Sequence, residues 1–157
     1  MSAPAFMARV IELSRRGMEA GHGFPFGAVI VRQGEIIAEA HNEVVSSCDP
    51  TAHAELLAVR RACGRLRTYT LKGCELYTNA APCCMCMSSM LWAKLDRAYY
   101  TLDMADSRAI GLGDEPFYEE LARPLERRSI VPMVRLPEFA DAARAVLEDW
   151  ATAAKGG

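Results

Sequence analysis

The chain has 157 residues with a formal net charge of −2, of which 51% are hydrophobic and 24% are charged. This length predicts one domain, and this composition excludes a largely disordered chain. The slightly acidic balance argues against a broad electrostatic interaction with nucleic acid, and no apolar run reaches the roughly 18 residues of a membrane span. The N-terminal MSAPAFMARV lacks the basic and apolar stretches of a secretory signal, so we expect a cytoplasmic protein.

The first part of the chain predicts a helix, a hairpin and a second helix. Apolar residues at helical spacing predict a helix over residues 5–20. Two β-type runs around a glycine-containing turn predict a hairpin over residues 28–40. Asp49 followed by Pro50 is typical of a helix N-cap and first turn, so we expect the second helix over residues 51–63.

The rest of the chain alternates strands and helices. Strands are predicted at residues 74–78 and 97–100, with a helix that begins at Pro82 between them. The further predicted elements are a loop over 103–114, a short helix over 116–123, an edge strand over 130–134 and a last helix after Pro137. The strand at 130–134 is placed at an edge because its proline removes a ladder donor. This order predicts an α/β fold with one mixed sheet between helices.

The six cysteines indicate metal chemistry rather than disulfides, because the chain has no export signal. Cys83 and Cys86 lie three residues apart at a helix start, so their sulfur atoms share a face and can bind one ion. The electropositive N-terminus of that helix favours their thiolate form. Cys84 is rotated by about 100° from Cys83 and is expected to point away from the ion.

His53-Ala54-Glu55 supplies an imidazole and a carboxylate to the same chemistry. These two side chains can approach one point only near the N-terminal end of their helix, so one can bind the metal while the other lies beside it. One histidine and two cysteines favour zinc, and three protein ligands leave the fourth position of a tetrahedral site for water. Zinc lowers the pKa of such a water to about 7, and a free carboxylate can move its proton. The expected chemistry is hydroxide addition to an electron-poor carbon with loss of a protonated leaving group.

The pattern H-x-E…P-C-x-x-C is the known signature of zinc-dependent nucleobase deaminases. The sequence resembles the cytidine deaminase-like superfamily, and within it the bacterial guanine deaminases, from Gly23 to about Pro124. The most specific stretch is residues 49–55. The resemblance implies a three-layer α-β-α fold with a five-stranded mixed sheet. It also implies a single zinc-dependent deaminase domain over residues 1–157 with one Zn²⁺ per chain.

The resemblance assigns roles to individual residues. It implies that His53, Cys83 and Cys86 hold the zinc, that Glu55 is the proton shuttle and Asp114 a second catalytic residue, and that Asn42, the backbone N–H of Ala54, Phe26 and Trp92 contact the substrate. The residues alone also allow a turn role for Asn42, core positions for Phe26 and Trp92, and a helix-cap role for Asp114. In these enzymes the C-terminal segment is exchanged across a homodimer, which implies exchange of the helix over about residues 137–157.

Two departures from the guanine deaminase pattern leave the substrate open. The usual Cys-Glu-Pro-Cys-Pro-Met-Cys is replaced here by Ala80-Ala81-Pro82-Cys83-Cys84-Met85-Cys86, and the C-terminus lacks the terminal tyrosine or acidic group. The leading hypothesis is hydrolytic deamination of a free, guanine-like base with release of ammonia. The alternatives are a cytosine, isocytosine or aminotriazine substrate, adenosine in tRNA, and a non-catalytic zinc domain. We expect neither a membrane nor a nucleic acid as a partner.

Overall fold

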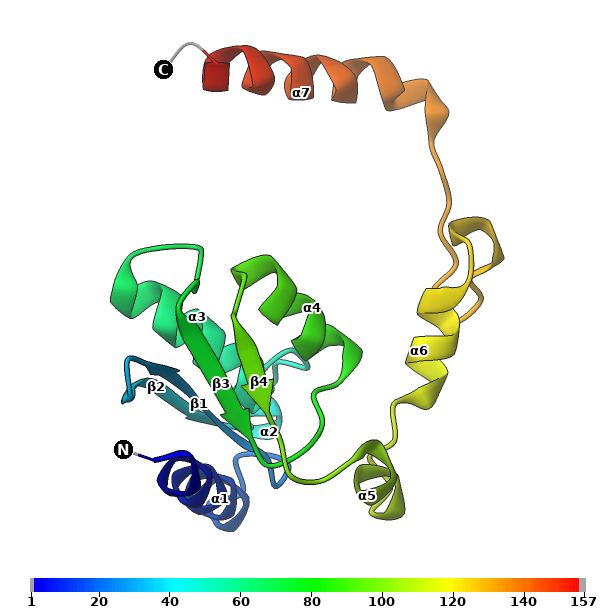
Figure 1. Ribbon diagram of the computed structural model, residues 1–157. Coiled ribbons are helices and arrows are strands. Elements are labelled where there is room, and N and C mark those ends of the chain that lie inside the picture. The colour runs from blue at the N-terminus through cyan, green and yellow to red at the C-terminus, as the bar shows by residue number, and fades with distance from the viewer. Residues whose placement is uncertain (1, 156–157) are drawn as a thin grey trace. The chain divides into compact units, whose positions relative to one another are not determined.

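The computed structural model describes residues 2–155, which form two compact units that divide between Glu115 and Pro116 (Figure 1). The last two residues of the predicted final helix, 156 and 157, lie outside the described residues. No helix of the described chain has the length and apolar character needed to cross a membrane.

The first unit contains every strand of the described chain. Its elements are α1 (Ala3–Glu19), β1 (Gly27–Arg32), β2 (Glu35–His41), α2 (Val44–Ser47), α3 (Ala54–Leu66), β3 (Cys74–Thr78), α4 (Cys84–Ala93), β4 (Arg97–Tyr99) and α5 (Met104–Ala109). The chain continues with α6 (Glu115–Ala122), the 3₁₀ helices η1 (Leu125–Arg127) and η2 (Pro137–Phe139), and α7 (Ala140–Lys155).

The sheet has the strand order β2-β1-β3-β4, in which β1 is antiparallel to both neighbours and β3 is parallel to β4. The mixed sheet is therefore confirmed, but the prediction of five strands is wrong, because the described chain contains four. The expected fifth strand, residues 130–134, has irregular backbone and exposed side chains. It contains Pro132, which cannot donate to a ladder, and it pairs with no strand among the described residues.

The alternation of side chains along β1 separates two apolar cores. Ala28 and Ile30 face the core shared with α3 and α4, while Val29 and Val31 face the core shared with α1. Figure 1 shows the sheet with α1 on one side and α3 and α4 on the other. A central strand buried on both faces explains why residues 28–31 form one continuous apolar run. The predicted arrangement of helices on both faces of a sheet is confirmed.

Two helices begin later than the sequence predicts. Asp49 does not cap a helix but closes a turn, since its Oδ1 accepts the backbone N–H of Thr51 at 2.8 Å. His53 is the N-cap of α3 instead. In the same way Cys83, one residue after Pro82, is the N-cap of α4. Both motifs that carry chemistry therefore lie at helix N-termini, with one ligand in the cap position of each helix.

The stretch predicted as a loop over residues 103–114 contains α5. This helix is stabilised by a reciprocal capping box, in which Asp103 accepts backbone N–H groups of the first turn and Asp106 accepts the backbone N–H of Asp103. The paired aspartates are visible in the sequence, but glycines at 111 and 113 dominate the composition of this stretch and favour a loop.

Candidate active site

The N-termini of α3 and α4 bring one imidazole and two thiols together. His53 Nδ1 lies 3.6 Å from Cys83 Sγ and 3.6 Å from Cys86 Sγ, and the three ligand atoms all lie within 4.8 Å of one another. Within residues 2–155 this is the one group of three metal-ligating side chains that converges in this way. Cys84 is not part of the group, as its rotation around the helix predicts.

The spacing of these atoms fits zinc. A tetrahedral ion with Zn–S bonds of about 2.3 Å and Zn–N bonds of about 2.0–2.1 Å places nitrogen and sulfur about 3.6 Å apart. The observed distances between His53 and the two cysteines match this value. The donor set, one imidazole and two soft sulfurs with only three protein ligands, is that of a catalytic rather than a structural zinc site.

The two thiols of the site differ in acidity. The Cys86 thiol donates to Cys83 and, with help from His53, lowers the pKa of Cys83 to about 4. The same contact, together with burial, raises the pKa of Cys86. The hydrogen bond with Cys83 raises the pKa of His53. The site thus concentrates negative charge on Cys83, and a cation that binds here displaces protons from the other two ligands.

Glu55 lies beside the three ligands in the first turn of α3. Its side chain is buried, and burial is the main cause that raises its pKa to about 7. The negative charge of Cys83 raises this pKa further, while a hydrogen bond with Cys86 and the charge of His53 lower it. A carboxyl group with a pKa near 7 can both accept and donate a proton at neutral pH.

Asp114 lies within electrostatic reach of the same group. It is half-buried, and burial followed by the negative charge of Cys83 raises its pKa. Its charge in turn raises the pKa of His53. The structure therefore brings this residue, 31 positions after Cys83, to the neighbourhood of the ligands.

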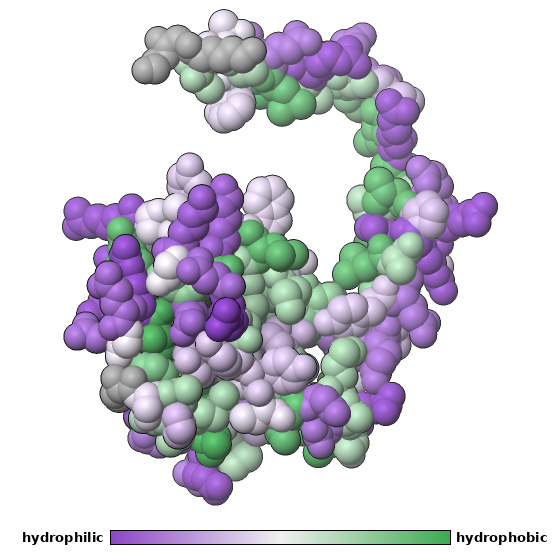
Figure 2. Space-filling view, viewed as in Figure 1, coloured by the Kyte–Doolittle hydropathy of each residue, from purple (hydrophilic) through white to green (hydrophobic). Residues whose placement is uncertain are grey.

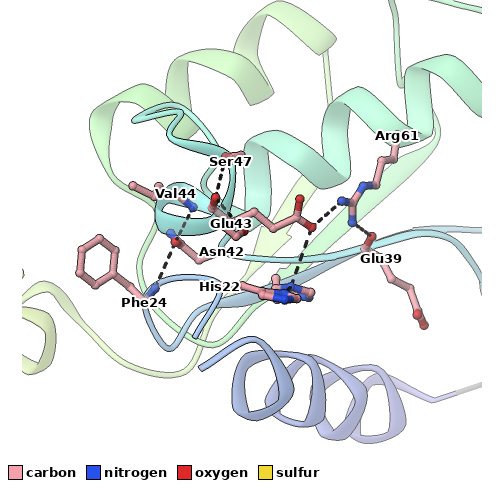
Figure 3. A network of polar contacts seen from close by, with 10 residues as sticks. His22, Phe24, Glu39, Asn42, Glu43, Val44, Ser47 and Arg61 are labelled. Carbon is pink, nitrogen blue, oxygen red and sulfur yellow. Dashed lines mark hydrogen bonds and ion pairs between the residues drawn. The ribbon is translucent and has the colours of Figure 1, made fainter. Parts of the chain in front are cut away.

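Asn42 is fully buried at the end of β2 and holds the loop that follows α1. Its Oδ1 accepts the backbone N–H groups of Phe24 at 3.1 Å and Val44 at 3.2 Å (Figure 3). These two donors fix which end of the amide is oxygen. The remaining NH₂ group has no hydrogen-bond partner among the described residues. Asn42 therefore stabilises a turn with its oxygen, and the two N–H donors of its NH₂ group stay unused.

Backbone hydrogen bonds tie the segments of Phe26 and Ala54 to the end of β2: Asn42 donates to the carbonyl of Phe26 at 2.9 Å, and Glu43 donates to the carbonyl of Ala52 at 2.9 Å. Phe26 is half-buried against the core shared with α3 and α4. Its loop is held by Asn79, which accepts the N–H of Gly27 at 2.9 Å and donates to the carbonyl of Pro25 at 3.0 Å. Sequence reasoning missed Asn79, whose partners lie more than 50 residues away. Ala54 is the first residue of α3, so its N–H has no acceptor within the helix.

Trp92 is placed differently from the other predicted substrate contacts. It is 84% exposed on the outer side of α4. There it lines a shallow surface groove with Tyr69, Arg67 and Ser89. Within a single chain the structure does not bring Trp92 to the metal ligands.

Fold and site together define a zinc-dependent deaminase. A family model described as "Cytidine and deoxycytidylate deaminase zinc-binding region" matches residues 1–102, and the chain belongs to this family.

Known proteins resemble the chain beyond the zinc-binding region. Guanine deaminase of Bacillus subtilis (strain 168) is 44% identical over 130 residues, which are 83% of this chain and 83% of that protein. The X-ray structure of guanine deaminase from Bacillus subtilis matches with a TM-score of 0.86 and 41% identity, covering 94% of this chain and 95% of that chain. The tRNA-specific adenosine deaminase of Aquifex aeolicus (strain VF5) is 42% identical over 101 residues, 64% of this chain and 66% of that protein.

Proposed function

We propose that the protein deaminates a free aminopurine base, guanine or a close relative, and releases ammonia. The observation that carries this proposal is the likeness to guanine deaminase, which extends over 94% of the chain with a TM-score of 0.86. The converging ligands with a buried carboxyl beside them supply the chemistry that such a reaction needs.

His53, Cys83 and Cys86 would hold the zinc, which when bound lowers the pKa of a water to about 7. Glu55 takes a proton from water as the oxygen bonds to the ring carbon that carries the amino group, and gives that proton to the adjacent ring nitrogen. Glu55 then takes the remaining hydroxyl proton and delivers it to the amino nitrogen. The C–N bond breaks, ammonia leaves and a carbonyl remains. A carboxyl pKa of about 7 suits each of these transfers.

The donors around the site favour a base with two neighbouring acceptors. The NH₂ group of Asn42 and the N–H of Ala54 both donate, and Phe26 supplies an aromatic face. Guanine presents O6 and N7 as acceptors on one edge, whereas adenine presents one acceptor and one donor there. In our proposal Asp114 accepts a hydrogen bond from an N–H group of the base on its opposite side.

The likeness to a tRNA-specific adenosine deaminase supports adenosine in tRNA as a second candidate. The net charge of −2 disfavours it, because a grip on RNA needs a basic surface. The experiment that separates the candidates measures ammonia release by zinc-loaded protein from guanine, adenine, cytosine, isocytosine, an aminotriazine and tRNA. We expect the highest kcat/KM with guanine. Preference for tRNA, or no turnover of any free base, would contradict the proposal.

We further propose that the protein is a homodimer in which the helix over about residues 137–157 is exchanged, so that each copy completes one deaminase domain. Large apolar side chains exposed on both units support this: on α4 Leu91 and Trp92, and on α7 Leu147 and Trp150. Contiguous exposed apolar surface is typical of an interaction site. The six cysteines are all free thiols, which suits the reducing cytoplasm where we place the enzyme.

A further inference from the structure

A chain of four polar side chains lies outside the metal site and links the loop after α1, the end of β2 and α3 (Figure 3). His22 Nδ1 lies 2.8 Å from His41 Nε2. Glu43 Oε1 lies 3.9 Å from the same Nε2 and accepts Nη2 of Arg61 at 2.6 Å. Arg61 also donates from Nη1 to the carbonyl of Glu39 at 2.8 Å. The deamination chemistry described above uses none of these side chains.

The two imidazoles meet through a hydrogen bond that holds a single proton. Their planes differ by 23° and their centroids are 5.0 Å apart, while the facing nitrogens are only 2.8 Å apart. The rings therefore meet edge to edge, with one nitrogen donating and the other accepting. If both rings carried a full set of protons, two N–H groups would face each other and the contact would open.

The fold fixes this pair in place. A Cβ on Gly17 would collide with the ring of His41, so the backbone of α1 packs directly on that ring. Burial lowers the pKa of His41, and the charges of Arg61, Arg16 and His22 act in the same direction against the opposing charge of Glu43. These groups come from α1, α3 and the two loops that surround the ring.

The pair holds both chain segments that orient the amide of Asn42. The carbonyl of His22 accepts the backbone N–H groups of Val45 at 3.1 Å and Ser46 at 3.0 Å. Phe24, two residues after His22, donates its N–H to Asn42 Oδ1. A Cβ on Gly23 would collide with that same oxygen, so the loop backbone touches the amide directly.

We propose that the His22–His41 pair, braced by Glu43 and Arg61, is a positioning unit that aims the NH₂ group of Asn42 at the substrate. The proposal rests on the proposed function, since it takes Asn42 as a substrate contact. The unit sets the affinity for the base and leaves the chemical step unchanged, because the two histidines and Glu43 lie on other elements than Glu55 and the zinc ligands, and Arg61 lies six residues after Glu55 in α3. It also weakens binding in strong acid, when both rings carry a full set of protons and the hydrogen bond between them breaks.

The test compares steady-state kinetics with guanine for wild type, His22→Phe and His22→Gln. We expect His22→Phe to raise KM about five- to tenfold with kcat nearly unchanged, as the loss of one positioning hydrogen bond predicts. His22→Gln keeps a donor and an acceptor and should restore most of the affinity. The wild-type KM should rise only in acid well below the ordinary histidine pKa of about 6.5, where both rings carry a full set of protons, and the KM of His22→Phe should not follow it. A fall in kcat with KM unchanged, or the same pH profile in both proteins, would overturn the proposal.

A second pair of variants, at two arginines of α3, tests the proposal even if His22→Phe does not fold. Arg61 and Arg65 both donate from α3 to a carbonyl of β2, but only Arg61 also contacts Glu43. Arg61→Gln should raise KM about two- to fivefold, because it weakens the positioning hydrogen bond without removing it. Arg65→Gln should not change KM. Equal effects of the two would refute the role of Glu43.

A measurement without turnover separates this inference from the proposed function. In the zinc-loaded protein, the side-chain amide NMR signals of Asn42 should shift or broaden in His22→Phe and recover in His22→Gln. If wild type deaminates no free base but these signals behave as expected, the proposed function fails while the positioning of Asn42 stands. Unchanged Asn42 signals in His22→Phe would refute the positioning itself.

Discussion

The position of a cysteine within α4 decides what its thiol does. Cys83 occupies the N-cap and Cys86 follows at the third helical position, so both sulfurs reach the imidazole of His53. Cys84 lies between them, and burial raises the pKa of its thiol. A thiol that stays protonated and points elsewhere contributes packing rather than ligation.

Serine substitutions should separate these roles. Cys83→Ser should lower zinc affinity at least about 100-fold. Mutation of a residue that only hydrogen-bonds a metal ligand already lowers metal affinity by about 10–100-fold. Cys84→Ser should keep one zinc per chain. Elemental analysis after dialysis against a weak chelator measures both. Equal zinc loss in the two variants would mean that Cys84 also ligates the ion.

The ligand residues could be predicted because their spacing is local, whereas their surroundings could not. A three-residue interval at a helix start places Cys83 and Cys86 together whatever the rest of the fold does. The orientation of the Asn42 amide and the role of Asn79 depend on backbone groups that only the folded sheet brings near. The roles of Asp114 and Trp92 in catalysis and substrate binding stay predictions.

At the scale of elements, close contacts between backbones decide how α1 sits on the sheet. A Cβ on Gly27 would collide with the backbone of α1 at Val10 and Ser14. Nothing lies within 4 Å of a Cβ built on Gly64, which is inside α3. Substitution of the two glycines by alanine should therefore change the free energy of unfolding in opposite directions.

Alanine substitution should show this difference. Gly27→Ala should lower the free energy of unfolding by about 1–3 kcal/mol, because α1 must shift to admit a methyl group. Gly64→Ala should raise it by about 0.5–1 kcal/mol, because alanine is the better helix former. Urea denaturation followed by circular dichroism measures both changes. A stabilising Gly27→Ala would contradict the packing of α1 described here.

An ion pair ties the same helix to β2. Arg9 donates to both carboxylate oxygens of Glu39, at 2.8 and 2.6 Å, and this lowers the pKa of Glu39. Because the folded-state pKa is depressed, the stabilisation is present above the unfolded pKa of about 4.3 and is lost as pH falls below it. Arg9→Met should cost about 1 kcal/mol of unfolding free energy at pH 7 and much less near pH 3. A cost independent of pH would show that Arg9 acts through packing alone.

The type of an element could be predicted where its apolar pattern was strong. It could not be predicted where the element depends on pairing with another part of the chain. The continuous apolar run of β1 and the periodicity of α1 predicted both elements correctly. The run at residues 130–134 has the composition of a strand, but its proline and the lack of a neighbouring strand leave it irregular. Composition can indicate a strand without supplying the partner that a strand needs.

At the scale of the whole molecule, the exposed apolar side chains support the proposed homodimer. Figure 2 shows hydrophobic residues at the surface among polar ones. Trp150 is 72% exposed on α7, and Leu91 is 70% exposed on α4. Large exposed apolar side chains are typical of interaction surfaces when they form a patch.

Sedimentation should therefore give the mass of two chains at micromolar concentration. Leu91→Asp should shift the mass toward one chain, because a buried charge in an apolar interface is costly. Lys72→Asp, a charge change at an exposed position just before β3, is the control and should remain dimeric. A wild-type mass of one chain would contradict the homodimer.

The central claim is that a zinc held by His53, Cys83 and Cys86 works with the proton shuttle Glu55. The most direct measurement compares wild type and Glu55→Gln for zinc content and for ammonia release from guanine. Glutamine keeps the shape of the side chain but cannot carry a proton. The account predicts one zinc per chain in both proteins and a loss of at least about 100-fold in kcat for the variant. Equal turnover by the two proteins, or wild-type protein that holds no zinc, would contradict it.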